Sequence, residues 1–182
     1  MTERRYDNNS RIPHLWSIVL AGGEGTRLAP MIKQWLGVER PKQYCTFTGT
    51  RSMLQHTVDR ADCLASPYRR VTVVGAHHKE EADRQLWQRG GKLVLQPANR
   101  DTAAGVYLPL TYVRAAAPDA TVVIYPSDHF VHPEEQFNEA VRHAVLAVEL
   151  MKDRLVLLGM RPEGNKLEYG HIKLDRYLGG YG

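Results

Sequence analysis

Cysteine, long apolar runs and blocks of like charge are all scarce in this sequence. Only two cysteines, Cys45 and Cys63, occur in 182 residues. This excludes a disulfide-rich scaffold and favours buried free thiols in a reducing, cytoplasmic setting. No apolar run approaches the roughly 18 residues of a membrane span, and residues 1–11 lack the apolar core of a signal peptide. We therefore expect no association with a membrane.

Charge also limits the choice of partner. Lys and Arg number 24 and Asp and Glu 20, a formal net charge of +4, and the basic residues are scattered along the chain. Weak, dispersed positive charge favours phosphate-bearing ligands slightly and does not predict nucleic-acid binding. With 43% hydrophobic and 24% charged residues, the composition is that of one globular domain.

The apolar pattern predicts strands that alternate with helices. Continuous runs rich in Val, Leu and Ile, typical of parallel strands covered on both faces, occupy residues 16–21, 71–75, 93–96, 121–125 and 155–159. Helical patterns lie between them, at 52–65, 79–88, 102–117 and after Pro133. This alternation predicts an α/β fold with a doubly wound, mostly parallel sheet and helices on both faces.

Several side chains carry expectations of their own. Ser52 with Gln55 three residues later predicts a capping box at the start of the first of these helices. Trp87 and Ala103 are expected to face the core from the second and third helices. Ile124 is expected to be buried in the fourth strand.

A glycine-rich turn, in the sequence LAGGEGTRLAP, follows the first predicted strand. Because Gly22, Gly23 and Gly25 lack a Cβ, the backbone N–H groups of such a turn can approach an anion closely. Arg27 adds a planar fork for phosphate oxygens, and Lys42, in the sequence RPKQ, adds a compact positive charge. Together these features predict a binding site for a polyphosphate.

Other interpretations of the glycines fit less well. A P-loop requires Gly-Lys-Ser/Thr, which occurs nowhere in the chain. A dinucleotide fingerprint requires a third glycine where Leu28 stands. An ordinary strand-to-loop turn remains open for the glycines alone, and the Thr-Arg and Pro-Lys that follow count against it.

Three further segments complete a family resemblance: QPANRDTAA at 96–104, PSDH at 126–129 and YGHI at 169–172. With GGxGTRLxP and PKQ, they resemble the signature of the sugar-nucleotide pyrophosphorylases, and within that family the mannose-1-phosphate guanylyltransferases. The resemblance implies a Rossmann-like nucleotidyltransferase fold. It also implies that a nucleoside triphosphate, with GTP favoured, and a sugar 1-phosphate react to give an NDP-sugar such as GDP-mannose and pyrophosphate. A homodimer is one assembly left open.

The resemblance also implies roles for individual residues. Those expected to bind the nucleotide are Ala21, Gly22, Gly23, Gly25, Thr26, Gln96, Arg100, Thr102 and Ser127. Arg27, Lys42 and Asp128 would be catalytic, with Asp128 also the ligand of the Mg²⁺ cofactor. Tyr169 and Gly170 would lie near the sugar. For Asp128, a purely structural turn residue is the alternative.

The order of motifs and strands adds an independent expectation. The glycine turn, the segment from Gln96 and the segment with Ser127 each follow a predicted strand. Ligands of doubly wound sheets bind outside the carboxyl ends of the strands. These motifs should therefore line one crevice.

For the domain organisation, we expect a polar N-terminal tail at 1–13 and a nucleotidyltransferase catalytic domain at 14–182. This domain is expected to be C-terminally incomplete, because the family's later sugar-binding and second metal-binding segments have no counterpart. Two alternatives stay open: a truncated or inactive nucleotide-binding module with little turnover and, more distantly, a nicotinamide-dependent oxidoreductase.

Overall fold

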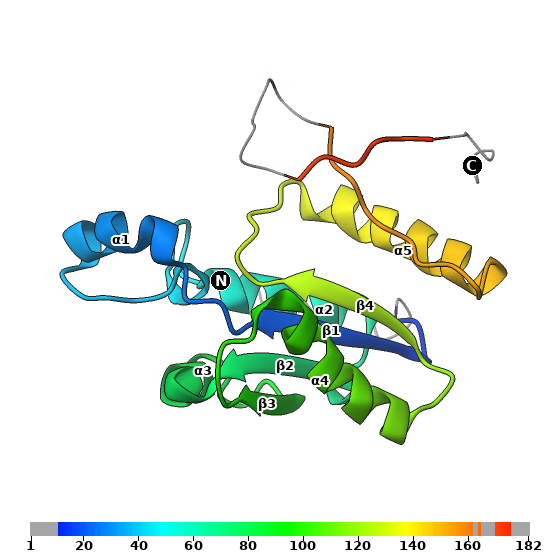
Figure 1. Ribbon diagram of the computed structural model, residues 1–182, viewed down its shortest axis with the longest axis horizontal. Helices are drawn as coiled ribbons and strands as arrows, with labels where there is room; N and C mark the ends of the chain where they lie inside the picture. Colours follow the sequence, from blue (N-terminus) through cyan, green and yellow to red (C-terminus); the bar gives the residue numbers. More distant parts are fainter. Residues whose placement is uncertain (1–10, 162–163, 165–169, 176–182) are drawn as a thin grey trace.

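The computed structural model describes residues 11–161, 164 and 170–175 and contains one four-stranded parallel sheet (Figure 1). Its strands are β1 (Leu15–Ala21), β2 (Arg70–Gly75), β3 (Lys92–Gln96) and β4 (Thr121–Pro126). The spatial order β3-β2-β1-β4 places β1 between two partners. Strand order therefore reverses at β1, since β2 and β4 lie on opposite sides of it.

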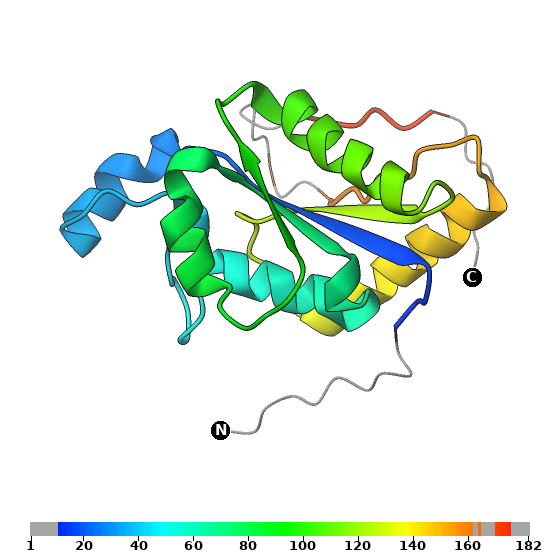
Figure 2. The same cartoon turned by 90° about the horizontal axis from the view of Figure 1, so that it is seen from below.

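Helices cover both faces of the sheet, as Figure 2 shows. One face is covered by α4 (Asp101–Ala116), and the other by α2 (Met53–Leu64), α3 (Lys79–Gln85) and α5 (Glu134–Leu150). The short α1 (Ala29–Leu36) lies beyond the carboxyl end of β1, away from the sheet (Figure 1). Four 3₁₀ turns complete the elements: η2 (Thr26–Leu28), η3 (Lys42–Tyr44), η4 (Pro67–Arg69) and η5 (Ala76–His78). The predicted doubly wound α/β fold is confirmed.

Strand β1 organises the core because both of its faces are apolar. Leu15 and Val19 belong to the cluster under α2 and α5, whereas Trp16 and Ile18 belong to the cluster under α4. Alternate side chains of a strand point to opposite faces, so one strand contributes to both cores. Val113 is the buried residue that α4 contributes to the second cluster.

The starts of two helices follow the capping residues that the sequence contains. The Ser52 side chain accepts a hydrogen bond from the Gln55 N–H, and the Gln55 side chain accepts one from the Ser52 N–H. This confirms the predicted capping box. Pro133 precedes the first turn of α5, where its missing N–H costs nothing.

Three side chains are more exposed than expected. Trp87 is 75% exposed, because α3 ends at Gln85 and the chain has already left the helical path. Ala103 is exposed, because α4 turns Gly105, Pro109 and Val113 toward the sheet instead. Ile124 is 38% exposed on an edge strand.

The predicted strand at 155–159 is absent, and that prediction was wrong. Residues 155–159 form neither helix nor strand, and Leu155 is 95% exposed. An apolar run becomes a strand only when a neighbour pairs with its N–H and C=O groups. Among the described residues, the sheet ends at β4 on this side.

Both cysteines are free thiols, as expected, but only Cys45 is buried and Cys63 is partly exposed. Cys63 lies in α2, but Cys45 lies in a buried loop after η3 and not in a strand. Its burial raises the pKa of the Cys45 thiol. Among the described residues, no helix combines the length and the apolar character that crossing a bilayer requires.

The expected N-terminal tail falls mostly outside the described residues, which begin at Arg11. Arg11 donates a hydrogen bond from Nε to the Asp62 carbonyl, and the Ile12 N–H donates to the Leu64 carbonyl. The chain is thus attached to α2 before residue 14.

Ile18 and Ile124 offer a matched test of this core, because they are register partners on β1 and β4. Ile18 is 0% exposed, and Ile124 is 38% exposed. Ile18→Ala should lower the free energy of unfolding by roughly 2–5 kcal/mol through loss of burial and a residual cavity. Ile124→Ala should cost clearly less. Equal losses in urea unfolding would contradict this placement of β1.

Candidate functional site

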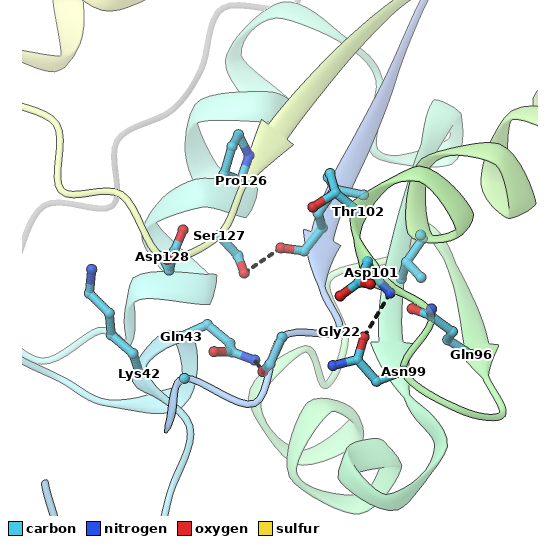
Figure 3. A pocket seen from close by; sticks show the side chains of 15 residues that line it. Gly22, Lys42, Gln43, Gln96, Asn99, Asp101, Thr102, Pro126, Ser127 and Asp128 are labelled. Carbon is cyan, nitrogen blue, oxygen red and sulfur yellow. Dashed lines mark hydrogen bonds between the residues drawn. The ribbon is translucent and has the colours of Figure 1, made fainter. Parts of the chain in front are cut away.

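A cavity of about 360 Å³ opens at the carboxyl ends of the strands (Figure 3). The loops after β1, β3 and β4 all contribute to it, as the order of motifs predicts. Its lining comprises Leu20, Gly22, Gly23, Gly25, Lys42, Gln43, Val73, Gln96, Asn99, Asp101, Thr102, Gly105, Pro126, Ser127 and Asp128. Side chains distant in sequence therefore meet at the point where strand order reverses, the usual ligand position in such sheets.

The loop after β1 is shaped by glycine. Gly25 has φ +63°, and a Cβ there would lie 3.0 Å from the Lys42 backbone nitrogen. A side chain at this position would meet both backbone strain and a steric clash. Gly25 thus allows the segment carrying Lys42 to approach the loop.

Gln43 ties these two segments together. Its side-chain Nε2 donates to the Ala21 carbonyl at 3.1 Å and to the Gly23 carbonyl at 2.7 Å. Gln43 is buried, where unpaired polar groups are costly. These bonds pair its amide donor with the two backbone carbonyls. The RPKQ segment is therefore fixed against the glycine loop by its last residue.

Tyr44 lies beneath the same loop. It is 1% exposed, and its hydroxyl donates to the Ala21 carbonyl at 3.4 Å. Burial raises the pKa of the Tyr44 phenol, and the nearby carboxylates of Glu81 and Glu24 raise it further. Tyr44 is accordingly a neutral structural donor.

Gln96, at the end of β3, lies against the glycine loop from the other side. A Cβ on Gly22 would lie 3.0 Å from Gln96 Oε1, so any other residue at 22 would press on the Gln96 side chain. Gln96 is 8% exposed, and its Nε2 has no hydrogen-bond partner within the described part of the chain. A buried amide donor without a partner is costly. A ligand that accepts this hydrogen bond would remove the cost.

The start of α4 brings three polar residues to the cavity: Asn99, Asp101 and Thr102. Asp101 has φ +61°, an uncommon conformation for a residue other than glycine. Its N–H donates to the Asn99 side-chain oxygen at 3.0 Å. This local bond supports the turn that directs the first turn of α4 toward the cavity.

Ser127 and Asp128 follow β4 and differ in role. The Ser127 hydroxyl donates to the Leu20 carbonyl at 2.6 Å, and its N–H donates to the same oxygen at 3.0 Å. Ser127 therefore fastens β4 to β1. Asp128 is half-exposed, and the only ion-pairing side chain near its carboxylate among the described residues is His129, with Nε2 at 3.6 Å. Its oxygens remain accessible from the cavity (Figure 3).

Some predicted site residues lie outside this cavity. Thr26 and Arg27 are exposed on η2, and Arg100 lines an adjoining depression with Tyr107. The Ala21 carbonyl is engaged by Gln43 and Tyr44. Gly170 is exposed and apart from the cavity, and Tyr169 falls outside the described residues.

Three polar lining residues are absent from the sequence prediction: Gln43, Asn99 and Asp101. Each stands inside a segment whose pattern is recognisable, RPKQ or QPANRDTAA. Nothing in the letters distinguishes a lining side chain from a neighbour that points away. Position within the motif is the only available signal.

Comparison with known proteins agrees with this geometry. The nucleotidyl transferase family matches residues 16–179. The chain is 33% identical over 159 residues to the xanthan biosynthesis protein XanB of Xanthomonas campestris pv. campestris (strain ATCC 33913), covering 86% of the chain and 32% of the relative. It is 32% identical over 166 residues to a mannose-1-phosphate guanylyltransferase of Escherichia coli K12. That match covers 87% of this chain and 33% of the relative.

A solved structure shares the fold. It is described as a mannose-1-phosphate geranyltransferase from Thermus thermophilus and superposes with a TM-score of 0.61 at 29% identity. The match covers 75% of this chain and 38% of that one. The chain spans about a third of the length of the curated relatives above. From the family match over nearly its whole length, the chain belongs to the nucleotidyl transferase family.

Proposed function

We propose that the cavity binds a nucleoside triphosphate and is the active site of a sugar-phosphate nucleotidyltransferase. The observation that carries the proposal is the convergence of the glycine loop, Lys42, Gln96 and Asp128 on one cavity at the carboxyl ends of β1, β3 and β4. In the proposed reaction, a phosphate oxygen of a sugar 1-phosphate attacks the α-phosphorus, and pyrophosphate leaves. Names of relatives favour GTP and mannose 1-phosphate.

Each group has a physical task in this proposal. Backbone N–H groups from Gly22 to Thr26 would hold the triphosphate, and Arg27 would contact its terminal phosphates. Lys42 has no ion-pair partner in the described part of the chain, so its charge is available for the α-phosphate. The free amide donor of Gln96 would meet an acceptor on the base edge.

The donor set also suits Mg²⁺. This ion prefers one or two carboxylates together with phosphate oxygens and waters, and the half-exposed Asp128 carboxylate meets that requirement. Asp101 is a second carboxylate in the cavity lining. When bound, Mg²⁺ would neutralise charge on the phosphates, while the chain's own residues position them.

Removing the Lys42 amine should slow product formation more than it weakens nucleotide binding. Lys42→Ala is expected to lower kcat by roughly 10²–10³, the scale for losing one preorganised transition-state donor. The matched control is Lys152→Ala, an exposed lysine outside the cavity. Steady-state assays with Mg²⁺, GTP and mannose 1-phosphate measure the difference, and an unchanged kcat in Lys42→Ala would remove this amine from the mechanism.

Asp128→Asn keeps the side-chain shape and removes the charge that would attract Mg²⁺. Nucleotide affinity should lose its dependence on Mg²⁺, while the melting temperature without ligand stays near that of the parent. The control is Asp119→Asn. Asp119 is exposed and precedes the amino end of β4, whereas Asp128 follows its carboxyl end. Titrations in which mutant and parent respond equally to Mg²⁺ would show that the Asp128 carboxylate is structural.

Nucleotide binding can be tested without turnover. A triphosphate at 100 times its Kd should stabilise the folded state by roughly 2.7 kcal/mol. At about 2–4 °C per kcal/mol for a chain of this size, Tm should rise by roughly 5–11 °C with Mg²⁺-GTP. NAD should give no shift. A melting scan with no shift for any triphosphate would overturn the proposal.

Product analysis then separates an active enzyme from a binding module. With Mg²⁺, each nucleoside triphosphate and a panel of sugar 1-phosphates, an active chain releases an NDP-sugar and pyrophosphate. Thermal shifts without product would favour an inactive nucleotide-binding module. The same panel reports which base and which sugar are used.

A further inference from the structure

A second cluster of ligand-forming side chains lies beside the cavity, between the loops after β1 and β2. Glu24 belongs to the glycine loop, and His77 and His78 belong to η5. His77 Nε2 is 2.9 Å from Glu24 Oε1, and His78 Nε2 is 4.0 Å from Glu24 Oε2. One ligand atom from each residue lies within 4.8 Å of the others, the only such trio among the described residues.

The backbone holds the two imidazoles in place. A Cβ on Gly75 would lie 2.8 Å from His77 Cε1, so the His77 ring occupies space that any other residue at 75 would take. The His78 ring packs against the buried Tyr44 ring, with centroids 5.5 Å apart. The two imidazole centroids are 3.9 Å apart. These contacts direct both rings toward the Glu24 carboxylate.

We propose that Glu24, His77 and His78 bind a divalent transition-metal ion, with Zn²⁺ as the best probe. Two imidazoles and one carboxylate suit zinc, whereas imidazole is a poor ligand for Mg²⁺. Tetrahedral coordination with Zn–N distances of roughly 2.0–2.1 Å needs ligand atoms about 3.3 Å apart. The separations given above bracket that value, so small side-chain rotations complete the site.

Charge and exposure agree with this assignment. The His78 side chain is 15% exposed and that of His77 is 56% exposed, so the site is anchored on one side and open on the other. The Glu24 carboxylate supplies a negative charge that would attract the cation. Glu81 also lies close, but its carboxylate accepts a hydrogen bond from Gln85 and pairs with Arg84.

The exposed side of the cluster, at His77, lies next to the glycine loop. A metal ion there would place positive charge beside Gly23 and Gly25, next to the Glu24 carboxylate. The site is distinct from Asp128, which lies after β4. Metal binding here does not depend on nucleotidyl transfer and can be measured without nucleotide.

Calorimetric titration of the full chain with Zn²⁺ tests the proposal, and Co²⁺ absorption reports the coordination geometry. We expect one ion per chain, with affinity reduced by more than about tenfold in His77→Ala and in Glu24→Gln. Both side chains are well exposed, so these variants should fold; equal melting temperatures without metal verify this. His143→Ala is the control, because His143 pairs only with Glu139 along α5, at 3.4 Å, among the described residues.

Two outcomes would overturn the assignment. One is the absence of Zn²⁺ binding by the parent chain. The other is equal affinity in the parent, His77→Ala and Glu24→Gln, which would place the ion elsewhere, for example on Cys63, which all three retain. A Co²⁺ spectrum that survives in His143→Ala and disappears in His77→Ala would support it.

Discussion

The parallel pairing of β1 with both β2 and β4 is the constraint on which the rest of the molecule depends. The strand is buried on both faces, so its apolar side chains join α2 and α5 on one side and α4 on the other. Parallel strands in register bring their carboxyl ends to one edge. Gly22, Gln96 and Ser127 are therefore neighbours although they are far apart in sequence. The cavity is a consequence of strand direction.

Short polar contacts convert this edge into a shaped site. Gln43 holds the glycine loop by two carbonyls, and Ser127 fastens β4 to the end of β1. A Cβ at Gly25 would meet the Lys42 backbone, and one at Gly22 would press on the Gln96 side chain. Two groups that line the cavity, Gln96 Nε2 and the Lys42 amine, have no partner among the described residues and are available for a ligand. Rigid support with a few free polar groups is what preorganised binding requires.

Two neighbouring positions on the same loop have different chemistry. The glycines and Lys42 line the cavity and suit phosphate, whereas Glu24 faces the imidazoles of η5 and suits a transition metal. The imidazole cluster arises because β1 and β2 are adjacent and end together, whereas the cavity also needs the loops after β3 and β4. A loop that leaves a buried strand can thus present backbone on one side and a side chain on the other.

The sequence by itself determined the α/β class, four of the strands, the capping box at Ser52 and the motifs that line the cavity, because these depend on local periodicity and turn chemistry. The tertiary structure decided what depends on neighbours. Residues 155–159 have strand-like letters but no pairing partner among the described residues, and Ile124 is apolar but lies on an edge strand. Sequence order also could not show that Gln43 supports the loop or that Glu24 meets His77 and His78. The first contact exists only once the chain returns to the end of β1, and the second only once β1 and β2 lie side by side. Hydrogen bonding and metal coordination require distances that the order of residues does not contain.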